Sequence, residues 1–565
     1  MEFLLTSLLL LPFIGAAIGA FLPGGKSARS WALLVSLVTA LLAIILAYQF
    51  FNAPDLNISG IMSKHYRITF SDKTVDAMTM KTIGFAVNLG VDSISLWLIL
   101  LTAFLMPLSV AASFGSIKNR EKEYYAWMTL LMGAMIGVFL ARDVILFYIF
   151  FELTLIPMFF IIGIWGGPER RYAAGKFFLF TFAGSVFTLA ALVYLGMGAH
   201  SFSIVKIVAY AQDKINPTER LWCTLGILAG LAVKVPLFPV HTWLPLAHTE
   251  APTAGSVILA GVLLKLGTYG VLRFAVPIGL VANGKVVSPG LIHAIGVLCL
   301  IGVIYGALVA WVQQDIKKLV AYSSVSHLGF CILGLVALND WGMQGSVLYM
   351  VNHGLSTGAM FLVIGMIYDR YHTRDINALS GMARIMPKMA FFFILFTMAS
   401  IGLPGLNGFV SEFLTILGAF TSPHLGVGYG AIAALGIILG AVYMLHMAAK
   451  VIWGPLKVPA VDHGHGQETS QTDQGQAATP EPSHAHDSHG HAKPHTNDLT
   501  PREMTILVPI ALAVILLGVL PNTILTSILG PLQAIGLGQP QPASVVDVPT
   551  QAPAIVATVP HVSEP

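Results

Sequence analysis

Residues 221–248 read LWCTLGILAGLAVKVPLFPVHTWLPLAH, an apolar stretch that contains a lysine and is then interrupted by prolines. Its first part, about 221–240, has the length of a membrane-spanning helix. Pro236 and Pro239 break that helix, because proline lacks the N–H of the helical ladder and clashes with the preceding turn. A broken helix at membrane depth is tolerated only where it faces protein or a water-filled cavity. The stretch therefore predicts a bundle of membrane helices around a polar interior.

The composition of the whole chain points to the same class. Of its 565 residues, 56% are hydrophobic and only 10% are charged, whereas about 25% are charged in a typical soluble domain. So few charges cannot cover the surface of a soluble protein of this size. This excludes a soluble enzyme, a disordered chain and a nucleic-acid binder. The three cysteines form no C-x-x-C pair, which excludes a disulfide framework, a zinc ribbon and a thiolate-bound iron–sulfur cluster on this chain.

Apolar runs of about 20 residues recur along the chain and predict an all-α polytopic membrane protein with about 14 transmembrane helices. The predicted helices are 3–22, 31–51, 94–114, 125–141, 144–165, 177–198, 221–240, 255–276, 289–311, 318–338, 345–367, 389–420, 428–453 and 504–528. Helix 12 is too long for one straight span and contains Pro404, so we expect it to break as helix 7 does. A short interfacial helix is expected at 201–212.

The connections between these helices carry unequal numbers of cations. Odd-numbered connections and even-numbered connections contain 18 and 10 Lys and Arg residues, respectively. Because positive charges favour the cytoplasmic side, the odd loops are expected in the cytoplasm and both termini outside. Residues 454–503 are predicted to form a His-rich cytoplasmic loop without fixed metal-ligand spacing. This loop is interpreted as a solvated spacer, with weak metal binding left as an alternative. Residues 529–565 form a Pro/Ala/Val-rich tail that is expected to be flexible.

Counting the cations near helix ends with the loops leaves four charges well inside the predicted spans: Lys234, Lys265, Glu152 and Glu412. Each such charge costs about 2.5–3.5 kcal/mol at the centre of a bilayer. Two explanations remain, namely buried salt bridges that hold helices together and a proton relay. Buried ion pairs stabilise a protein poorly compared with apolar packing. A lysine can also gain or lose its proton when it is desolvated, and we therefore favour the relay.

Buried histidines are candidates to connect these charges. His327 and His353 lie among hydroxyl and amide side chains in predicted helices 10 and 11. Neutral imidazole can accept a proton on one ring nitrogen and donate one from the other. His241 and His248 flank Trp243 directly after helix 7. They are expected to shape a loop at the membrane surface, with a role in proton entry left as an alternative.

Several of these segments resemble one known family. They are Lys234–His248, Glu250–Thr253, Leu263–Lys265, and Asp315–Ser324 with His327. Over about residues 90–455, the chain resembles the antiporter-like subunits of respiratory complex I and of Mrp cation/proton antiporters. Within that family, Glu412 resembles the M-subunit type, because other members usually have lysine there. The segment Tyr368–Arg374 resembles the M subunit as well.

The resemblance implies two inverted five-helix repeats, at residues 125–276 (helices 4–8) and 289–453 (helices 9–13), after an N-terminal region of residues 1–124 (helices 1–3). Residues 504–528 would form helix 14. It also implies a place in the membrane arm of an NADH:quinone oxidoreductase in the bacterial inner membrane, with both termini in the periplasm. The partners would be neighbouring antiporter-like subunits on both sides and the lipid bilayer. No cofactor is expected on this chain, whereas NADH, FMN, iron–sulfur clusters and quinone would be bound by partner subunits.

By position, the resemblance assigns a role to each candidate residue. Glu152 and Lys234 would be the input pair and Lys265 the central relay. His327 and His353 would conduct protons, and Glu412 would face the periplasmic half-channel. The alternatives are a subunit of a multisubunit sodium/proton antiporter, a subunit of a membrane-bound hydrogenase, and a scaffold whose buried charges only dock neighbours.

Overall fold

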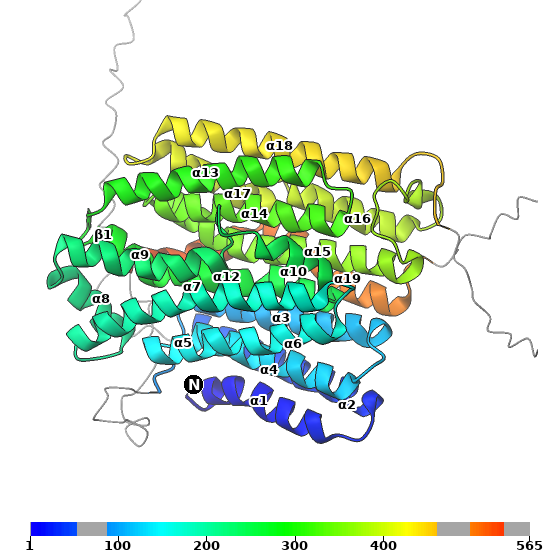
Figure 1. Ribbon diagram of the computed structural model, residues 1–565, viewed down its shortest axis with the longest axis horizontal. Coiled ribbons are helices and arrows are strands. Elements are labelled where there is room, and N and C mark those ends of the chain that lie inside the picture. The colour runs from blue at the N-terminus through cyan, green and yellow to red at the C-terminus, as the bar shows by residue number, and fades with distance from the viewer. Residues whose placement is uncertain (1, 53–86, 460–497, 536–565) are drawn as a thin grey trace, which may run out of the picture.

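The helices of this chain lie side by side along one common direction, from α1 (Glu2–Phe21) at one edge of the molecule to α18 (Val427–Ile452) at the opposite edge (Figure 1). The computed structural model describes residues 2–52, 87–459 and 498–535. Most of the predicted His-rich loop and tail lie outside these ranges, and all seven histidines of that loop do. Within the described ranges, the all-α class predicted from the sequence is confirmed.

The first half of the chain contributes α2 (Gly25–Phe51), α3 (Ser93–Ser116), α4 (Glu121–Leu140), α5 (Val144–Leu153), α6 (Leu155–Trp165), α7 (Arg170–Gly198), α8 (Ile204–Asp213), α9 (Pro217–Lys234) and α10 (Trp243–Glu250). One long span follows as α11 (Thr253–Ile258), the π-helix η2 (Leu259–Leu263), α12 (Leu264–Gly270) and the π-helix η3 (Val271–Leu280). Two short antiparallel strands, β1 (Val281–Ala282) and β2 (Lys285–Val286), close its end.

The second half contributes α13 (Pro289–Trp311), α14 (Ile316–Val336), α15 (Asp340–Tyr371), the 3₁₀ turn η4 (Met382–Arg384), α16 (Pro387–Ser400), α17 (Asn407–Thr421), α18, α19 (Pro501–Val519) and α20 (Asn522–Ala534). Twelve helical segments of the described chain are long and apolar enough to cross a membrane. The other two predicted spans are the broken ones. Predicted helix 7 (221–240) corresponds to α9, which stops at Lys234, and α10 follows beyond its predicted end, whereas predicted helix 12 consists of α16 and α17. Both breaks are therefore where the prolines predict them.

Two spans form the centre of the bundle. The most apolar stretches of Thr253–Leu280 and Asp340–Tyr371 are buried along their whole length, whereas only about a third of the corresponding residues of α2 and α19 are buried. The outer helices, such as α2, α7, α13 and α18, expose Leu, Ile, Val and Phe side chains on their outer faces. Such faces are expected to meet lipid. Polar groups on the two central spans are therefore insulated from lipid by surrounding protein.

Two further predicted spans are divided in the structure. Helix 14, predicted as one span at 504–528, is two helices, since α19 ends at Val519 and α20 begins at Asn522 after Pro521. Predicted helix 5 is interrupted at Thr154 between α5 and α6. Pro157 has no N–H to donate to the Leu153 carbonyl four residues earlier, which explains this interruption. The interfacial helix predicted at 201–212 is present as α8. The division into two repeats stays a prediction.

Candidate functional site

The four charged residues predicted inside the spans lie on irregular elements. Lys234 is the last residue of α9, Lys265 lies on α12 between the two π-helices, and Glu412 lies on α17 after a break. These three side chains are almost completely buried, at 2%, 0% and 4% exposure, respectively. Glu152 is half-buried on α5, two residues before the interruption. Glu152, Lys234 and Lys265 therefore lie within one residue of a place where regular α-helix begins or ends, and Glu412 lies in the second turn after a break.

The first group of side chains, which we call the Lys234 cluster, consists of Phe151, Glu152, Thr154, Ser185 and Lys234. The Lys234 ammonium donates a hydrogen bond to the Thr154 hydroxyl at 3.3 Å and lies 4.8 Å from the centroid of the Phe151 ring. The Ser185 hydroxyl, which donates to the Phe182 carbonyl at 2.8 Å, lies close to the Glu152 carboxylate. The carboxylate oxygen Oε1 of Glu152 has no hydrogen-bond partner. No ion pair within 4.0 Å joins Glu152 to Lys234, both of which the structure describes.

The end of α9 is fixed against its surroundings. The indole of Trp243 donates to the Val233 carbonyl at 2.9 Å, which satisfies one of the carbonyls that a helix end leaves free. A methyl group on Gly267 of α12 would lie 3.1 Å from the Lys234 Cβ and even nearer to Val235. Glycine at 267 therefore lets the helix that carries Lys265 pack directly against the end of α9.

The second group, which we call the relay chain, consists of Lys265, His353, His327, Tyr349 and Glu412. It begins where the Lys265 ammonium meets His353 Nδ1 at 2.8 Å. An ammonium group only donates, so Nδ1 of His353 accepts this hydrogen bond. The same ammonium also donates to the carbonyl of Ala260 in the π-helix η2. π-Helical turns are frequent at functional sites.

The relay chain continues across three helices. The rings of His353 on α15 and His327 on α14 have centroids 5.6 Å apart. His327 Nδ1 hydrogen-bonds the Tyr349 hydroxyl, and this hydroxyl donates to Oε1 of Glu412 on α17 at 2.8 Å. All four side chains border a small cavity of about 10 Å³, which is about the room needed for one water molecule. The polar side chains of the relay chain thus follow one another from Lys265 to Glu412.

The break between α16 and α17 shapes the last step of this chain. Gly402 has a φ of +73°, which L-residues with a side chain rarely adopt, and a methyl group there would collide with the Glu412 carboxylate. Asn352 of α15 donates to the Asn407 carbonyl, and Asn407 donates to the Asn352 carbonyl at 3.1 Å. This reciprocal pair fastens the first residue of α17 to α15, which carries Tyr349 and His353.

No hydrogen bond between described residues connects the Lys234 cluster to the relay chain. His248 of α10 is completely buried nearby and stacks on Phe361 of α15, with ring centroids 4.7 Å apart. Neither of its ring nitrogens has a hydrogen-bond partner. The expectation that His241 and His248 shape a surface loop is wrong, since they are only 3% and 0% exposed. The loop between α9 and α10 folds into the bundle because its prolines turn the chain within the membrane.

The count of cations inside the spans also needs correction. Lys317 was assigned to a loop, but it lies in the first turn of α14 and is only 7% exposed. Its ammonium donates to the carbonyl of Ala251, while Arg374 donates to the carbonyl of Thr249. Two cations thus bind the carbonyl groups at the end of α10, as is favourable at a helix C-terminus.

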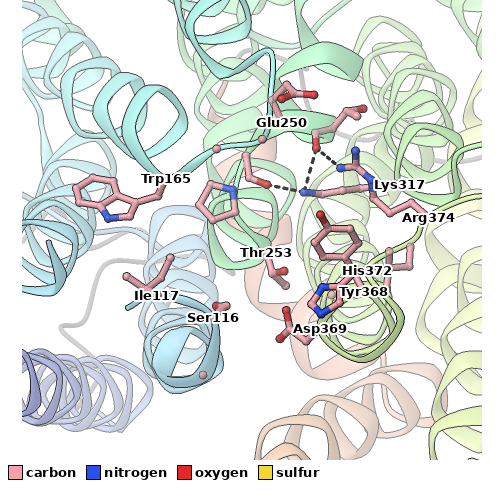
Figure 2. A pocket seen from close by; sticks show the side chains of 18 of the residues that line it. Ser116, Ile117, Trp165, Glu250, Thr253, Lys317, Tyr368, Asp369, His372 and Arg374 are labelled. Atoms are coloured by element: carbon pink, nitrogen blue, oxygen red, sulfur yellow. Dashed lines mark hydrogen bonds between the residues drawn. The ribbon is translucent and has the colours of Figure 1, made fainter. Parts of the chain in front are cut away.

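Lys317 lines a pocket of about 590 Å³ at one end of the bundle. Figure 2 shows its side chain pointing toward the carbonyl oxygens after α10, with Glu250 and Asp369 on the walls around it. The charged side chains of the lining are Lys118, Lys317, Arg370, Arg374 and Arg502 together with Glu250, Asp369 and Glu503.

At the opposite end of α3, three further charges form a closed group, which we call the Asp92 triad. Asp92 caps α3 and forms ion pairs with Arg273 of η3 and, at 3.4 Å, with Arg142. Asp92 is only 3% exposed, and burial alone would raise its pKa. The two guanidinium groups instead hold the pKa of Asp92 well below its usual range. Arg273, which falls near the end of predicted helix 8 but was counted with the following loop, lies inside a span in the structure.

Six residues of this candidate site stand out in the sequence, whereas Tyr349 does not. Tyr349 lies four residues before His353, so the two share one face of α15. This spacing of four residues was the sequence signal that could have identified Tyr349. Among the described residues, no group of three His, Cys, Asp or Glu side chains is arranged to hold a metal ion.

Comparison with known proteins places this geometry in a family. Residues 141–448 match the family described as NADH:quinone oxidoreductase/Mrp antiporter, and residues 35–140 match the amino terminus of NADH-ubiquinone oxidoreductase chain 4. NADH-quinone oxidoreductase subunit M of Rhodobacter capsulatus is 39% identical, over 94% of this chain and 96% of the relative. NADH-ubiquinone oxidoreductase chain 4 of Chondrus crispus is 37% identical, over 93% and 95%, respectively.

Solved structures agree. The chain is similar to one in respiratory complex I from Thermus thermophilus with bound NADH, with a TM-score of 0.75 and 28% identity over 95% of this chain and 100% of that one. A chain of the Mrp complex from Dietzia sp. DQ12-45-1b shares the fold, with a TM-score of 0.77 and 19% identity over 94% and 98%. The chain therefore belongs to the family of NADH:quinone oxidoreductase and Mrp antiporter membrane subunits and, within it, to the subunit M proteins.

Proposed function

We propose that this chain moves protons across the membrane through Glu152, Lys234, Lys265, His353, His327 and Glu412. As a subunit M protein, it is a multi-pass membrane subunit of respiratory complex I, and other complex I membrane subunits are its partners. The observation that carries the proposal is the relay chain, in which polar side chains continue from Lys265 to Glu412 inside an apolar bundle.

The chemistry of the contacts supports proton transfer. Lys265 bonds to a neutral imidazole and a carbonyl, and Lys234 bonds to a hydroxyl. Neither ammonium has a carboxylate within 4.0 Å, although both residues are almost completely buried. A buried cation without a counter-ion is costly, so loss of its proton is easier than in a closed ion pair. Each lysine is thus suited to exchange its proton when the charge of a neighbouring group changes.

The excess of cations in the odd loops supports placing the pocket beside Lys317 at the cytoplasmic end and the two termini in the periplasm. The lining of this pocket comes from the ends of odd-numbered connections and contains five cationic and three acidic side chains. In this orientation Glu412 delivers protons to the periplasm. The cytoplasmic membrane of a bacterium is the proposed location, and antiporter-like subunits are the proposed neighbours on both sides. NADH, FMN, iron–sulfur clusters and quinone are assigned to partner subunits.

The competing function is cation/proton antiport without a redox partner, as in the Mrp complex whose fold this chain shares. That likeness has only 19% identity, whereas the subunit M relative is 39% identical over nearly its whole length. Glu412, where other members of the family usually have lysine, also favours the complex I assignment.

The test is the Lys265→Met variant in the intact complex, reconstituted into vesicles. Methionine keeps the length of the side chain but cannot carry a proton. Proton uptake driven by NADH oxidation is expected to fall by about 100-fold, while the complex still assembles on a native gel. Lys206→Met, which removes an exposed lysine on α8, is the control and should pump normally. Normal pumping by Lys265→Met would refute the proposed function.

A further inference from the structure

Tyr349 lies between the last two titratable groups of the relay chain. Its hydroxyl hydrogen-bonds His327 Nδ1 and donates to Glu412 Oε1 at 2.8 Å. The direct distance from His327 Nδ1 to Glu412 Oε1 is 3.6 Å, which is too long for a hydrogen bond. Within the described part of the chain, the hydroxyl is therefore the only hydrogen-bonding bridge between the imidazole and the carboxylate.

The donor and acceptor roles along this bridge follow from counting hydrogens. A tyrosine hydroxyl has one hydrogen, and here it is directed to Glu412. The hydroxyl must therefore accept from His327, so Nδ1 of His327 carries a hydrogen. The other ring nitrogen of His327, Nε2, is buried without a partner. In the neutral ring Nε2 is the acceptor, which leaves it free to take a proton arriving from the side of His353.

We propose that the Tyr349 hydroxyl is a relay group that passes the proton from His327 to Glu412, an inference that rests on the proposed function. When a proton arrives on His327 Nε2, the N–H bond at Nδ1 breaks and a new O–H bond forms on Tyr349. At the same time the original Tyr349 O–H bond breaks and its proton binds the Glu412 carboxylate. His327 ends neutral with its proton on Nε2, Glu412 ends protonated, and Tyr349 ends as a phenol. No electron is transferred and no phenolate is needed.

The surroundings hold the hydroxyl in this role. Tyr349 is only 3% exposed, and its ring meets that of His327 edge-on, with an interplanar angle of 84°. Two other polar side chains of this region donate their hydrogens elsewhere. The Asn352 amide donates to Asn407 and Ser411, and the Ser411 hydroxyl donates to the Gly408 carbonyl. Among these groups, only Tyr349 contacts both His327 and Glu412.

The experiment compares Tyr349→Phe, Tyr349→Ser and the control Tyr125→Phe in the complete complex in vesicles, with Lys265→Met as the reference for loss of function. Phenylalanine keeps the ring but removes the hydroxyl. Proton pumping is expected to fall by about tenfold, equivalent to about 1.4 kcal/mol in the barrier. Serine supplies a hydroxyl and vacates the volume of the ring, so water can enter and pumping should partly recover. Tyr125 is buried with an unpartnered hydroxyl, and its loss should change nothing.

Each outcome supports or overturns the relay role of Tyr349 or the proposed function, provided that native gels show equal amounts of assembled complex for all variants. Slow pumping by Tyr349→Phe with recovery in Tyr349→Ser supports the relay role. Normal pumping by Tyr349→Phe overturns the role of Tyr349 while Lys265→Met still reports on the proposed function. Equal impairment of the phenylalanine and serine variants shows that the ring rather than the hydroxyl matters, and it also overturns the inference. Normal pumping by Lys265→Met refutes the proposed function itself.

Discussion

The Asp92 triad and the four charged residues predicted inside the spans differ in the kind of partner that their charged groups have. Asp92 is paired directly with two guanidinium groups and also caps a helix, so every strong interaction it makes is with a permanent charge or the backbone. Lys234, Lys265 and Glu412 are just as buried, but their hydrogen bonds go to the neutral or titratable side chains of Thr154, His353 and Tyr349 and to one carbonyl.

This difference separates a structural group of charges from the group proposed to carry protons. An aspartate between two arginines cannot change its protonation state without leaving two buried cations unpaired. A lysine bonded to an imidazole can pass a proton to a group that is able to accept it. The central charges therefore do not fit the alternative in which buried salt bridges only hold helices together. The Asp92 triad is the example of such a structural salt bridge in this molecule.

Removal of the acid from the Asp92 triad should give the largest effect, and it should act on stability. Asp92→Asn leaves two guanidinium groups buried without a counter-ion, which costs about 3–5 kcal/mol. The pKa of Asp92 lies below its unfolded value of 3.8, so its contribution is complete at neutral pH and is lost as the pH falls below about 4. The melting temperature of the solubilised complex, measured at pH 7 and at low pH, checks both statements.

A melting temperature unchanged from that of the parent complex at pH 7 would contradict the structural role of the Asp92 triad. Asp213→Asn, which changes an exposed aspartate on α8, is the control and should melt normally.

Glu412→Gln should act on function rather than stability, which sharpens the contrast with Asp92. The amide oxygen can still accept the hydrogen bond of Tyr349, so the complex should assemble and melt normally. Without a carboxylate to receive the proton, the pumping rate should fall by about 100-fold. Proton uptake in vesicles measures this, with the exposed Glu169→Gln as control. A lowered melting temperature with normal pumping would reverse the comparison.

Thr154→Val should give the smallest effect. Valine matches the shape of threonine but cannot accept the hydrogen bond of Lys234, whose contact with the Phe151 ring remains. Weaker solvation of the ammonium should slow pumping by about fivefold, or about 1 kcal/mol. Thr505→Val, at an exposed position on α19, is the matched control. A loss as large as that of Glu412→Gln would show that Thr154 is itself part of the relay.

Much of the fold follows from the sequence because lipid imposes simple rules. Runs of about 20 apolar residues locate the spans, and prolines locate the breaks at Pro236 and Pro404. The split of predicted helix 14 at Pro521 was missed, because the polar interruption after it is only Asn522 and Thr523 and the apolar run resumes at Ile524. The π-helices were missed as well. Their extra residue per turn leaves no mark in an apolar sequence that is buried on all sides.

The candidate site could be predicted where a charge stands out against an apolar background. Lys234, Lys265 and Glu412 are of this kind. Lys317 lies beside Lys318 at the start of a helix. Cations are common there, so the sequence predicts a loop position for Lys317. Tyr349 carries no charge, and its importance comes from two partners, 22 residues before it and 63 residues after it. Only the packing of α14 and α17 against α15 brings these three together.

The π-helical turns also determine the position of Lys265 along the membrane normal. The span Thr253–Leu280 has 28 residues, which as a straight α-helix would be about 42 Å long, although the hydrocarbon layer is only about 30 Å thick. With hydrogen bonds from residue i to i+5, each turn of η2 and η3 holds more residues and advances the chain less per residue. The number of residues in the π-helical turns on either side of Lys265 therefore sets the depth of Lys265 in the membrane.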